Sequence, residues 1–260
     1  MPRSHTTVQQ QFGAHAHHYV TSPDHVKGES LDHLLEWVQP QAAWRVLDVA
    51  TGGGHTALAL APHVQAVVAS DLTPEMLTAA EAFIRSKGLS NVSFRLADAC
   101  ALPFGDAEFD LVTCRIAPHH FPDCGRFVQE SARVLRPGGQ LAVIDNVTPP
   151  EVSAARHINA FEKLRDPSHQ WACSAVDWEA FFRAAGLDVQ RVALYRKSID
   201  FEGFCDRLSV PVHTRLQLRV MLRQAPAEAL AAIEPKFHGD PQTGPITFSL
   251  SQVLIIGRRA

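Results

Sequence analysis

The stretch of sequence that decides the fold is RVLDVATGGGHTAL, residues 45–58. It begins with a short apolar run from Val46 to Ala50 that contains one acid, Asp48, and an apolar-periodic helix starts at Thr56. Three glycines lie between the two. A strand that turns sharply into a helix leaves backbone N–H groups exposed at the helix N-terminus, and glycines let a ligand approach the main chain closely. The pattern therefore predicts a nucleotide-type site at the carboxyl end of a parallel strand.

The glycine loop alone leaves the ligand open. A dinucleotide fingerprint reads G-x-G-x-x-G, and Gly52 and Gly54 fit it with Ala57 tolerated at the last position. A carboxylate at Asp48, four residues before Gly52, would repel a pyrophosphate but would suit a cationic ligand with an ammonium group. A plain tight turn is the third interpretation of the same residues.

Two further acids favour a ligand site. Asp71 follows the apolar run 66–70 and lies 19 residues after Gly52, where a ribose-binding carboxylate is expected. The alternating segment 92–96 is followed by Asp98. Three successive strands thus each carry an aspartate at or near the carboxyl end. In a doubly wound sheet those ends form one crevice.

Four ordered motifs, VLDVATGGGHTA, ASDLTPEML, ADACALPFGDAEFDLVTCR and RVLRPGGQLAVID, resemble those of the class I S-adenosylmethionine-dependent methyltransferases. The sequence looks closest to the UbiE/MenG-like, methyltransferase type 11 branch, over roughly residues 10–195. The resemblance implies an α/β fold with a doubly wound, mostly parallel seven-stranded sheet, helices on both faces, a helical lid and an inserted cap. It also implies S-adenosylmethionine as the cofactor and methyl transfer as the activity.

The resemblance places cofactor contacts on these motifs. Asp48 would hold the amino group of the cofactor's methionine part, Asp71 would accept both ribose hydroxyls, and Leu72 would pack on the adenine. Asp98 would accept from the adenine amino group. The full expected cofactor-binding set is Tyr19, Asp48, Ala50, Gly52, Gly53, Gly54, Asp71, Leu72, Asp98, Ala99, Arg115 and His120. Structural alternatives stay open: a capping or strand-end acid at Asp48, a turn residue at Asp98, and a structural ion pair at Arg115.

His119 and His120 are the candidate catalytic residues. They follow the expected fourth strand, Phe109–Cys114, where the acceptor and cofactor meet in the resembled family. A histidine near neutral pKa suits a general base that deprotonates an acceptor hydroxyl, amine or activated carbon. The alternative is that one ring stacks in the cofactor pocket and the other packs under the lid.

The whole chain, residues 1–260, is expected to form one domain with three parts. Residues 1–38 are expected to form a lid and a helix, 44–148 the cofactor-binding core, and 149–176 with 200–234 a helical cap on the acceptor side. The lid rests on the family pattern Phe12, Ala16 and Tyr19. His15, His17 and His18 lack a carboxylate or cysteine at ligand spacing, so no metal is predicted.

Several elements are expected near the end of the sheet. Residues 137–139, Pro-Gly-Gly, are expected to stop a helix before a strand at 141–144. A sixth strand is expected over 187–195, and a last strand over 248–256, antiparallel at the sheet edge. Thr73 is expected to cap the helix that begins at Pro74.

Composition narrows the function classes. A net charge of −3 without a block of like charges argues against a protein devoted to nucleic acid, and no apolar run is long enough to span a membrane. Five cysteines without a C-x-x-C pair suggest reduced thiols and a cytoplasmic protein. The expected partner is a small-molecule methyl acceptor, and a homodimer stays open. The cap aromatics suit an apolar or aromatic acceptor, such as a quinol-type ring methylated on carbon or oxygen.

Two rival functions belong to other classes. A nicotinamide-dependent oxidoreductase would explain the glycine loop and Asp71, but not Asp48 or Asp98, and no Tyr-x-x-x-Lys pair is present. A non-catalytic S-adenosylmethionine-binding module is compatible with the same acids and glycines, since these indicate binding alone.

Overall fold

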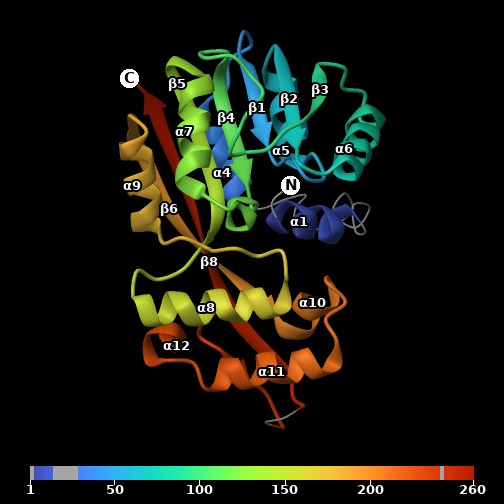
Figure 1. Cartoon of the computed structure of the whole chain (residues 1–260), viewed down its shortest axis with the longest axis vertical. Coiled ribbons are helices and arrows are strands. Elements are labelled where there is room, and N and C mark those ends of the chain that lie inside the picture. The colour runs from blue at the N-terminus through green and yellow to red at the C-terminus, as the bar shows by residue number, and fades with distance from the viewer. Residues whose placement is uncertain (1–2, 14–28, 241–242) are drawn as a thin grey trace.

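The computed structural model describes residues 3–13, 29–240 and 243–260, and its strands form one mixed sheet (Figure 1). The strands are β1 (Arg45–Val49), β2 (Ala66–Asp71), β3 (Val92–Leu96), β4 (Phe109–Arg115), β5 (Leu135–Val147), β6 (Leu187–Asp200), β7 (Lys236–Phe237) and β8 (Ile246–Arg259). Their order is β3-β2-β1-β4-β5-β8-β6, with β7 paired to β8. β1 to β5 pair in parallel, and β8 is antiparallel to β5 and β6. The predicted doubly wound, mostly parallel seven-stranded fold is confirmed.

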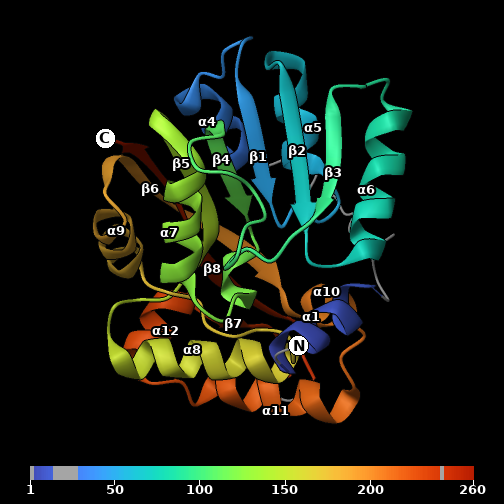
Figure 2. The same cartoon turned by 45° about the horizontal axis from the view of Figure 1, so that its top comes forward.

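Helices cover both faces of the sheet (Figure 2). They are α1 (Arg3–Gly13), α4 (Glu29–Val38), α5 (His55–Leu60), η1 (Ala61–His63), α6 (Pro74–Ser86), η2 (Pro118–His120), α7 (Cys124–Val134), α8 (Val152–Arg165), α9 (Ala175–Ala184), α10 (Phe201–Asp206), α11 (Val212–Arg223) and α12 (Ala227–Ile233). Side chains alternate along β1, so Leu47 packs with α7 and α9 on one face, whereas Val46 packs with α4 and α5 on the other. This arrangement leaves the carboxyl ends of the strands for a ligand.

The cap has a hydrophobic core of its own. Phe161 of α8 and Leu218 of α11 are buried there together with Ile199 of β6 and Phe248 of β8, which pair across the two strands. Figure 1 shows β6 and β8 running from the sheet into this helical layer. Both strands are therefore longer than predicted, because their ends are buried in the cap as well as in the sheet.

The predicted edge position of the last strand is wrong. β8 lies between β5 and β6, and β6 forms the edge. Residues 253–256 of β8 are fully or nearly fully buried on both faces, as a central strand requires, whereas Leu194 of β6 is 64% exposed. The antiparallel direction of β8 was predicted correctly.

Two local expectations near helix ends are also corrected. α7 ends at Val134, and residues 137–139 lie inside β5 rather than between a helix and a strand. Thr73 does occupy the N-cap position of α6, but its hydroxyl makes no capping bond and is buried without a partner. The Thr73 N–H donates to Asp71 Oδ1 at 2.9 Å, so Asp71 holds the backbone just before the helix.

Two further expectations concern membrane-spanning helices and the cysteine thiols. None of the helices in the described ranges combines the length and hydropathy needed to cross a membrane. The five cysteines, all within the described residues, are free thiols in the structure.

Candidate functional site

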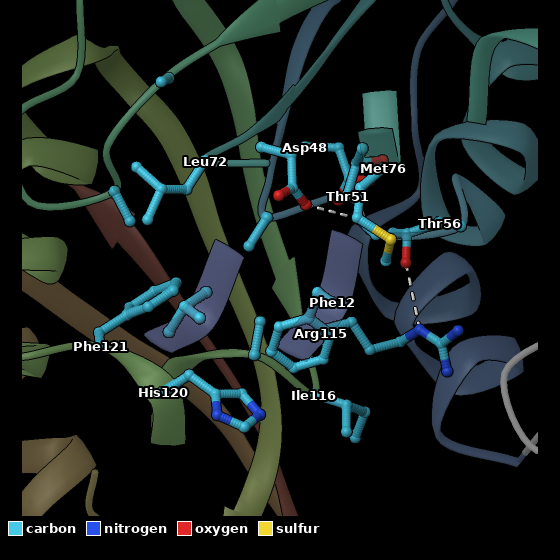
Figure 3. A pocket seen from close by; sticks show the side chains of 18 of the residues that line it. Phe12, Asp48, Thr51, Thr56, Leu72, Met76, Arg115, Ile116, His120 and Phe121 are labelled. Carbon is cyan, nitrogen blue, oxygen red and sulfur yellow. Dashed lines mark hydrogen bonds between the residues drawn. The ribbon is translucent and has the colours of Figure 1, made fainter. Parts of the chain in front are cut away.

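A cavity opens at the carboxyl ends of β1, β2 and β4, next to α1 (Figure 3). It is lined by every predicted cofactor-binding residue except Gly54 and Tyr19. Outside the described residues lie Tyr19, Ala16 and the N-terminal histidines His15, His17 and His18. The three aspartates predicted to share one crevice, Asp48, Asp71 and Asp98, do line the same cavity.

Asp48 is clamped by two hydroxyls. Thr51 Oγ1 donates to its Oδ2 at 2.6 Å and Thr113 Oγ1 donates to its Oδ1 at 2.7 Å (Figure 3 draws the first). The side chain is 1% exposed. Burial raises the pKa of Asp48 to about 6, although both hydroxyls and the charge of Arg115 oppose the shift. A cationic ligand in the cavity would supply the missing positive charge.

Asp71 orders the glycine loop. Its Oδ2 accepts from the Gly52 N–H at 3.0 Å, while its Oδ1 accepts from Thr73. Burial raises the pKa of Asp71, and these backbone donors act against the shift. Each carboxylate oxygen has more than one lone pair, so both can still accept from a ligand hydroxyl.

The glycines of the loop have different roles. Gly52 lines the cavity in the left-handed region, with φ +54°, and a Cβ there would lie 3.6 Å from Met76 Cε. Gly54 is at φ +83°, and a Cβ there would lie 2.9 Å from Ile84 Cδ1. Gly54 therefore allows α5 to pack on α6, and it does not line the cavity.

The backbone is strained where β1 and β4 meet the cavity. Ala50 has φ 51° and Ile116 has φ 53°, and both residues line the cavity. A β-branched residue with positive φ is unusual and costs on the order of 1–3 kcal/mol. The Ile116 N–H donates to Ile144 O at 2.7 Å, which helps to hold this conformation. Such strain concentrates at functional sites.

The far end of the cavity is formed by Leu72, Met76, Asp98 and Ala99. Asp98 Oδ1 accepts from the Cys100 N–H at 2.8 Å, so Asp98 also has the turn role that was the structural alternative. The apolar side chains of Leu72 and Met76 also line the cavity. These residues give this part of the cavity wall an acceptor oxygen and apolar side chains.

Arg115 crosses the cavity wall toward α5. Its Nε donates to Thr56 Oγ1 at 3.1 Å, as Figure 3 shows. Burial lowers the pKa of Arg115, and the charge of Asp48 counteracts this. Arg115 is thus attracted electrostatically to Asp48, which is the kind of structural role that the ion-pair alternative describes.

α1 covers the cavity from the N-terminal side. Val8 and Phe12 line it, and Gln9 Nε2 donates to Leu72 O at 2.9 Å. The Phe12 ring meets the His120 ring edge-on, with centroids 4.9 Å apart. α1 thus contacts both ends of the cavity, and Phe12 is the residue of the predicted lid pattern that the described chain includes.

His119 and His120 lie in different surroundings. His120 lines the cavity, whereas His119 does not and is 8% exposed. His119 Nδ1 donates to Asp145 Oδ1 at 2.6 Å. Burial works to lower the pKa of His119, but Asp145 raises it above its usual value. The pKa of His120 is well below its usual value because of burial and the neighbouring His119.

Known methyltransferases are similar to this chain in sequence. Residues 47–143 match the methyltransferase domain family. The chain is 35% identical over 251 residues to the uncharacterized methyltransferase YcgJ of Bacillus subtilis (strain 168), covering 96% of this chain and 98% of that protein. The chain belongs to the class I S-adenosylmethionine-dependent methyltransferases.

Two further comparisons describe how far this methyltransferase resembles known proteins. The crystal structure of YcgJ superposes with a TM-score of 0.85 at 36% identity, covering 88% of this chain and 97% of that one. A demethylmenaquinone methyltransferase of Thermus thermophilus is 43% identical over 114 residues, which is 43% of this chain and 51% of that protein. S-adenosylmethionine is the methyl donor of this methyltransferase.

The donor set fits that cofactor. S-adenosylmethionine carries an ammonium group, a ribose diol and an adenine, and the cavity offers a buried carboxylate, a second carboxylate with free lone pairs and an apolar end. Asp48, Asp71 and Leu72 are the residues in those three places. Figure 3 draws Asp48 and Leu72 in the upper part of the cavity and His120 and Phe121 in its lower part.

Several residues of the methyltransferase site were not predicted. They are Val8, Thr51, Thr56, Met76, Thr113, Ile116 and Phe121. Thr51 could have been found, because it lies inside the glycine loop and three residues from Asp48. Thr113 is 65 residues from Asp48 and reaches it only because β1 and β4 pair, with these two residues as partners.

Proposed function

We propose that this methyltransferase transfers the methyl group of S-adenosylmethionine to an aromatic small molecule, such as a quinol-type ring, by C- or O-methylation. The observation that carries the proposal is the make-up of the cavity. One half holds the acids and the glycine loop, and the other half holds Phe12, Phe121 and His120. An acceptor bound in the second half would face a cofactor bound in the first.

In the cofactor half, Asp48 holds the ammonium group and Asp71 accepts from the ribose hydroxyls. Leu72 packs on the adenine, and Asp98 accepts from its amino group. S-adenosylmethionine supplies a methyl group already activated on a sulfonium. The chain therefore has to orient the two reactants and exclude water, rather than provide a nucleophile.

In the acceptor half, His120 is the residue that takes a proton. It lines the cavity and is neutral at physiological pH, since burial and His119 lower its pKa. His119 does not line the cavity, so it affects the reaction only by lowering the pKa of its neighbour His120. The Thermus thermophilus relative bears the name of an enzyme acting on demethylmenaquinone, which supports a ring acceptor.

The test combines cofactor binding with methyl transfer. Calorimetry with S-adenosylhomocysteine should show binding to the full chain, and label from S-adenosylmethionine should reach a product in a panel of phenols, quinols, amines and thiols. His120→Gln should keep its affinity for S-adenosylhomocysteine and lose about 100-fold or more in turnover, the range of general base catalysis. Binding without transfer to the panel or to cell extract would instead identify a non-catalytic binding module.

A further inference from the structure

Three histidine rings meet where the sheet joins the cap. His119 and His120 belong to η2, and His169 belongs to the loop between α8 and α9. The ring centroid of His119 lies 4.2 Å from that of His120 and 5.5 Å from that of His169. Of the three, only His120 lines the cavity in the described part of the chain. Its orientation therefore decides which ring nitrogen meets an acceptor.

Ser168, which precedes His169, decides that orientation. His120 Nδ1 lies 3.1 Å from Ser168 Oγ, and Ser168 Oγ donates to Asp166 Oδ1 at 2.5 Å. A serine hydroxyl has only one proton to donate, and that of Ser168 is donated in the hydrogen bond to Asp166. Ser168 Oγ must then accept from His120, so His120 Nδ1 carries a proton. In the neutral ring the lone pair is on Nε2.

Asp166 is suited to fix this arrangement. Burial works to raise the pKa of Asp166, but the charge interaction with His120, the hydrogen bonds from Ser168 and the charge of Arg165 hold it below its usual value. The same Asp166 Oδ1 accepts from the Ser168 N–H at 2.8 Å, which orients the loop. The carboxylate therefore stays an acceptor, and the serine hydroxyl cannot turn to donate to His120.

The other nitrogen of His120 faces the cavity. None of the described residues bonds to Nε2, and Figure 3 shows the His120 ring directed toward the side chains of Phe12 and Ile116. The charges around the ring come from two elements. His119 lies beside it on η2, and Asp166 and His169 lie on the loop after α8. The two histidines have opposite pKa shifts, because Asp145 raises the pKa of His119 whereas burial and His119 lower the pKa of His120.

We propose that Ser168 and Asp166 are positioning residues that hold the Nε2 lone pair of His120 in the cavity, and that the acceptor is a phenolic compound whose hydroxyl proton this nitrogen removes during O-methylation. The proposal rests on the proposed function. The aromatic wall formed by Phe12 and Phe121 suits a ring, and a weak base suits an acidic hydroxyl rather than an aliphatic alcohol.

The step balances with one base. His120 Nε2 takes the phenolic proton, and an oxygen lone pair forms the O–CH₃ bond while the S–CH₃ bond breaks with its electrons remaining on sulfur. The products are an aryl methyl ether, neutral S-adenosylhomocysteine and the His120 imidazolium, whose charge faces Asp166. Methylation of a ring carbon would instead require a base that removes the proton from that carbon.

Nitrogen NMR on ¹⁵N-histidine-labelled protein tests the positioning directly. His120→Gln identifies the His120 signals by their loss. In the wild type His120 should be the tautomer with Nδ1 protonated, and in Ser168→Ala it should become a mixture of tautomers. Ser131→Ala is the matched control, because Ser131 is also fully buried but its hydroxyl has no partner. A wild-type ring protonated on Nε2, or an unchanged tautomer in Ser168→Ala, would overturn the positioning role.

The acceptor class is tested on the complex with S-adenosylhomocysteine. Added 1-naphthol should shift the His120 Nε2 signal by donating a hydrogen bond to it, whereas 1-methoxynaphthalene, which has no hydroxyl, should not. Equal shifts, or no shift with 1-naphthol, would overturn the phenolic assignment. Failure of S-adenosylhomocysteine to bind in calorimetry would instead count against the proposed function, while the tautomer measurement would still stand.

Discussion

The two halves of the cavity are built in different ways. In the cofactor half, Asp48, Gly52 and Asp71 come from one stretch of 24 residues, and their contacts run between neighbouring strand ends. In the histidine half, His120 is oriented by Ser168, 48 residues away on a loop of the cap. The first half can be recognised as a local motif, whereas the second exists only after the cap has packed on the sheet.

This difference leads to a functional expectation. Substitutions in the cofactor half should change the affinity for S-adenosylhomocysteine, and substitutions in the histidine half should change turnover or the state of His120 with little effect on that affinity.

Gly52→Val should abolish S-adenosylhomocysteine binding, with a loss of more than about 100-fold. Its φ of +54° is unfavourable for a β-branched side chain, and that side chain would enter the cavity. The control is Gly88→Val, which has φ +78° and open space around it far from the site. Both variants should lose about 1–2 kcal/mol of unfolding free energy in urea, but only Gly52→Val should lose binding. Equal affinities by calorimetry would reduce the loop to a turn.

Asp71→Ala should weaken binding about ten-fold or more. Charge-assisted hydrogen bonds are worth about 1.5–3 kcal/mol each, and two ribose hydroxyls would lose their acceptor. Because Asp71 also holds the Gly52 N–H, the variant disturbs the loop as well. Asp71→Asn keeps one acceptor oxygen and should lie between the wild type and Asp71→Ala in calorimetric affinity. An unchanged affinity in both would remove Asp71 from the site.

Asp48→Asn should have opposite effects on the stability of the protein and on its affinity for the ligand. The folded-state pKa of Asp48 is about 6 against 3.8, so its contribution to stability is largest at low pH and is lost as the pH rises through about 6. At pH 7.5 the ionised group costs about 3 kcal/mol before any ligand compensates. Asn cannot ionise, so the variant should gain stability relative to wild type at pH 7.5 and less so at pH 5.

Binding should change in the opposite direction. Asp48→Asn should lose about ten-fold in S-adenosylhomocysteine affinity at pH 7.5, since the ligand ammonium loses its carboxylate. Wild-type affinity should itself fall as the pH drops below about 6, and the variant should lack this dependence. Urea unfolding and calorimetry at both pH values measure the two effects. A variant that loses stability at pH 7.5 would show that the Thr51 and Thr113 bonds outweigh the cost of the buried charge.

Local motifs of the site could be predicted from the sequence, whereas contacts between distant segments could not. The glycine loop and the three aspartates were found because each lies at a strand end within a local pattern. The two hydroxyls on Asp48 illustrate the limit: Thr51 is local, whereas Thr113 depends on the pairing of β1 with β4. The position of β8 was missed because strand order is decided by which long strands bury both faces, and the partnership of Ser168 with His120 depends on the packing of the cap.

Phe12→Ala should have the smallest effect on affinity, because Phe12 is not among the polar contacts of the cofactor. Its ring meets His120 edge-on at 4.9 Å and lines the cavity from α1. Because that aromatic pair joins two residues of the protein and not the ligand, its loss should lower S-adenosylhomocysteine affinity by about two-fold or less. Phe237→Ala, a partly exposed phenylalanine of the cap that contacts Arg223, is the control and should leave affinity unchanged.

The variant also tests whether α1 belongs to the site as a cover. If α1 excludes water from the reacting groups, Phe12→Ala should lower turnover more than it lowers affinity, because an open cavity hydrates both His120 and the transferring methyl group. Gln9 would still hold α1 to Leu72, so the helix should stay in place and the effect should come from the lost ring alone. Equal losses in turnover and affinity would mean that α1 contributes binding surface only, and turnover at the wild-type level would show that Phe12 and α1 have no part in the histidine half.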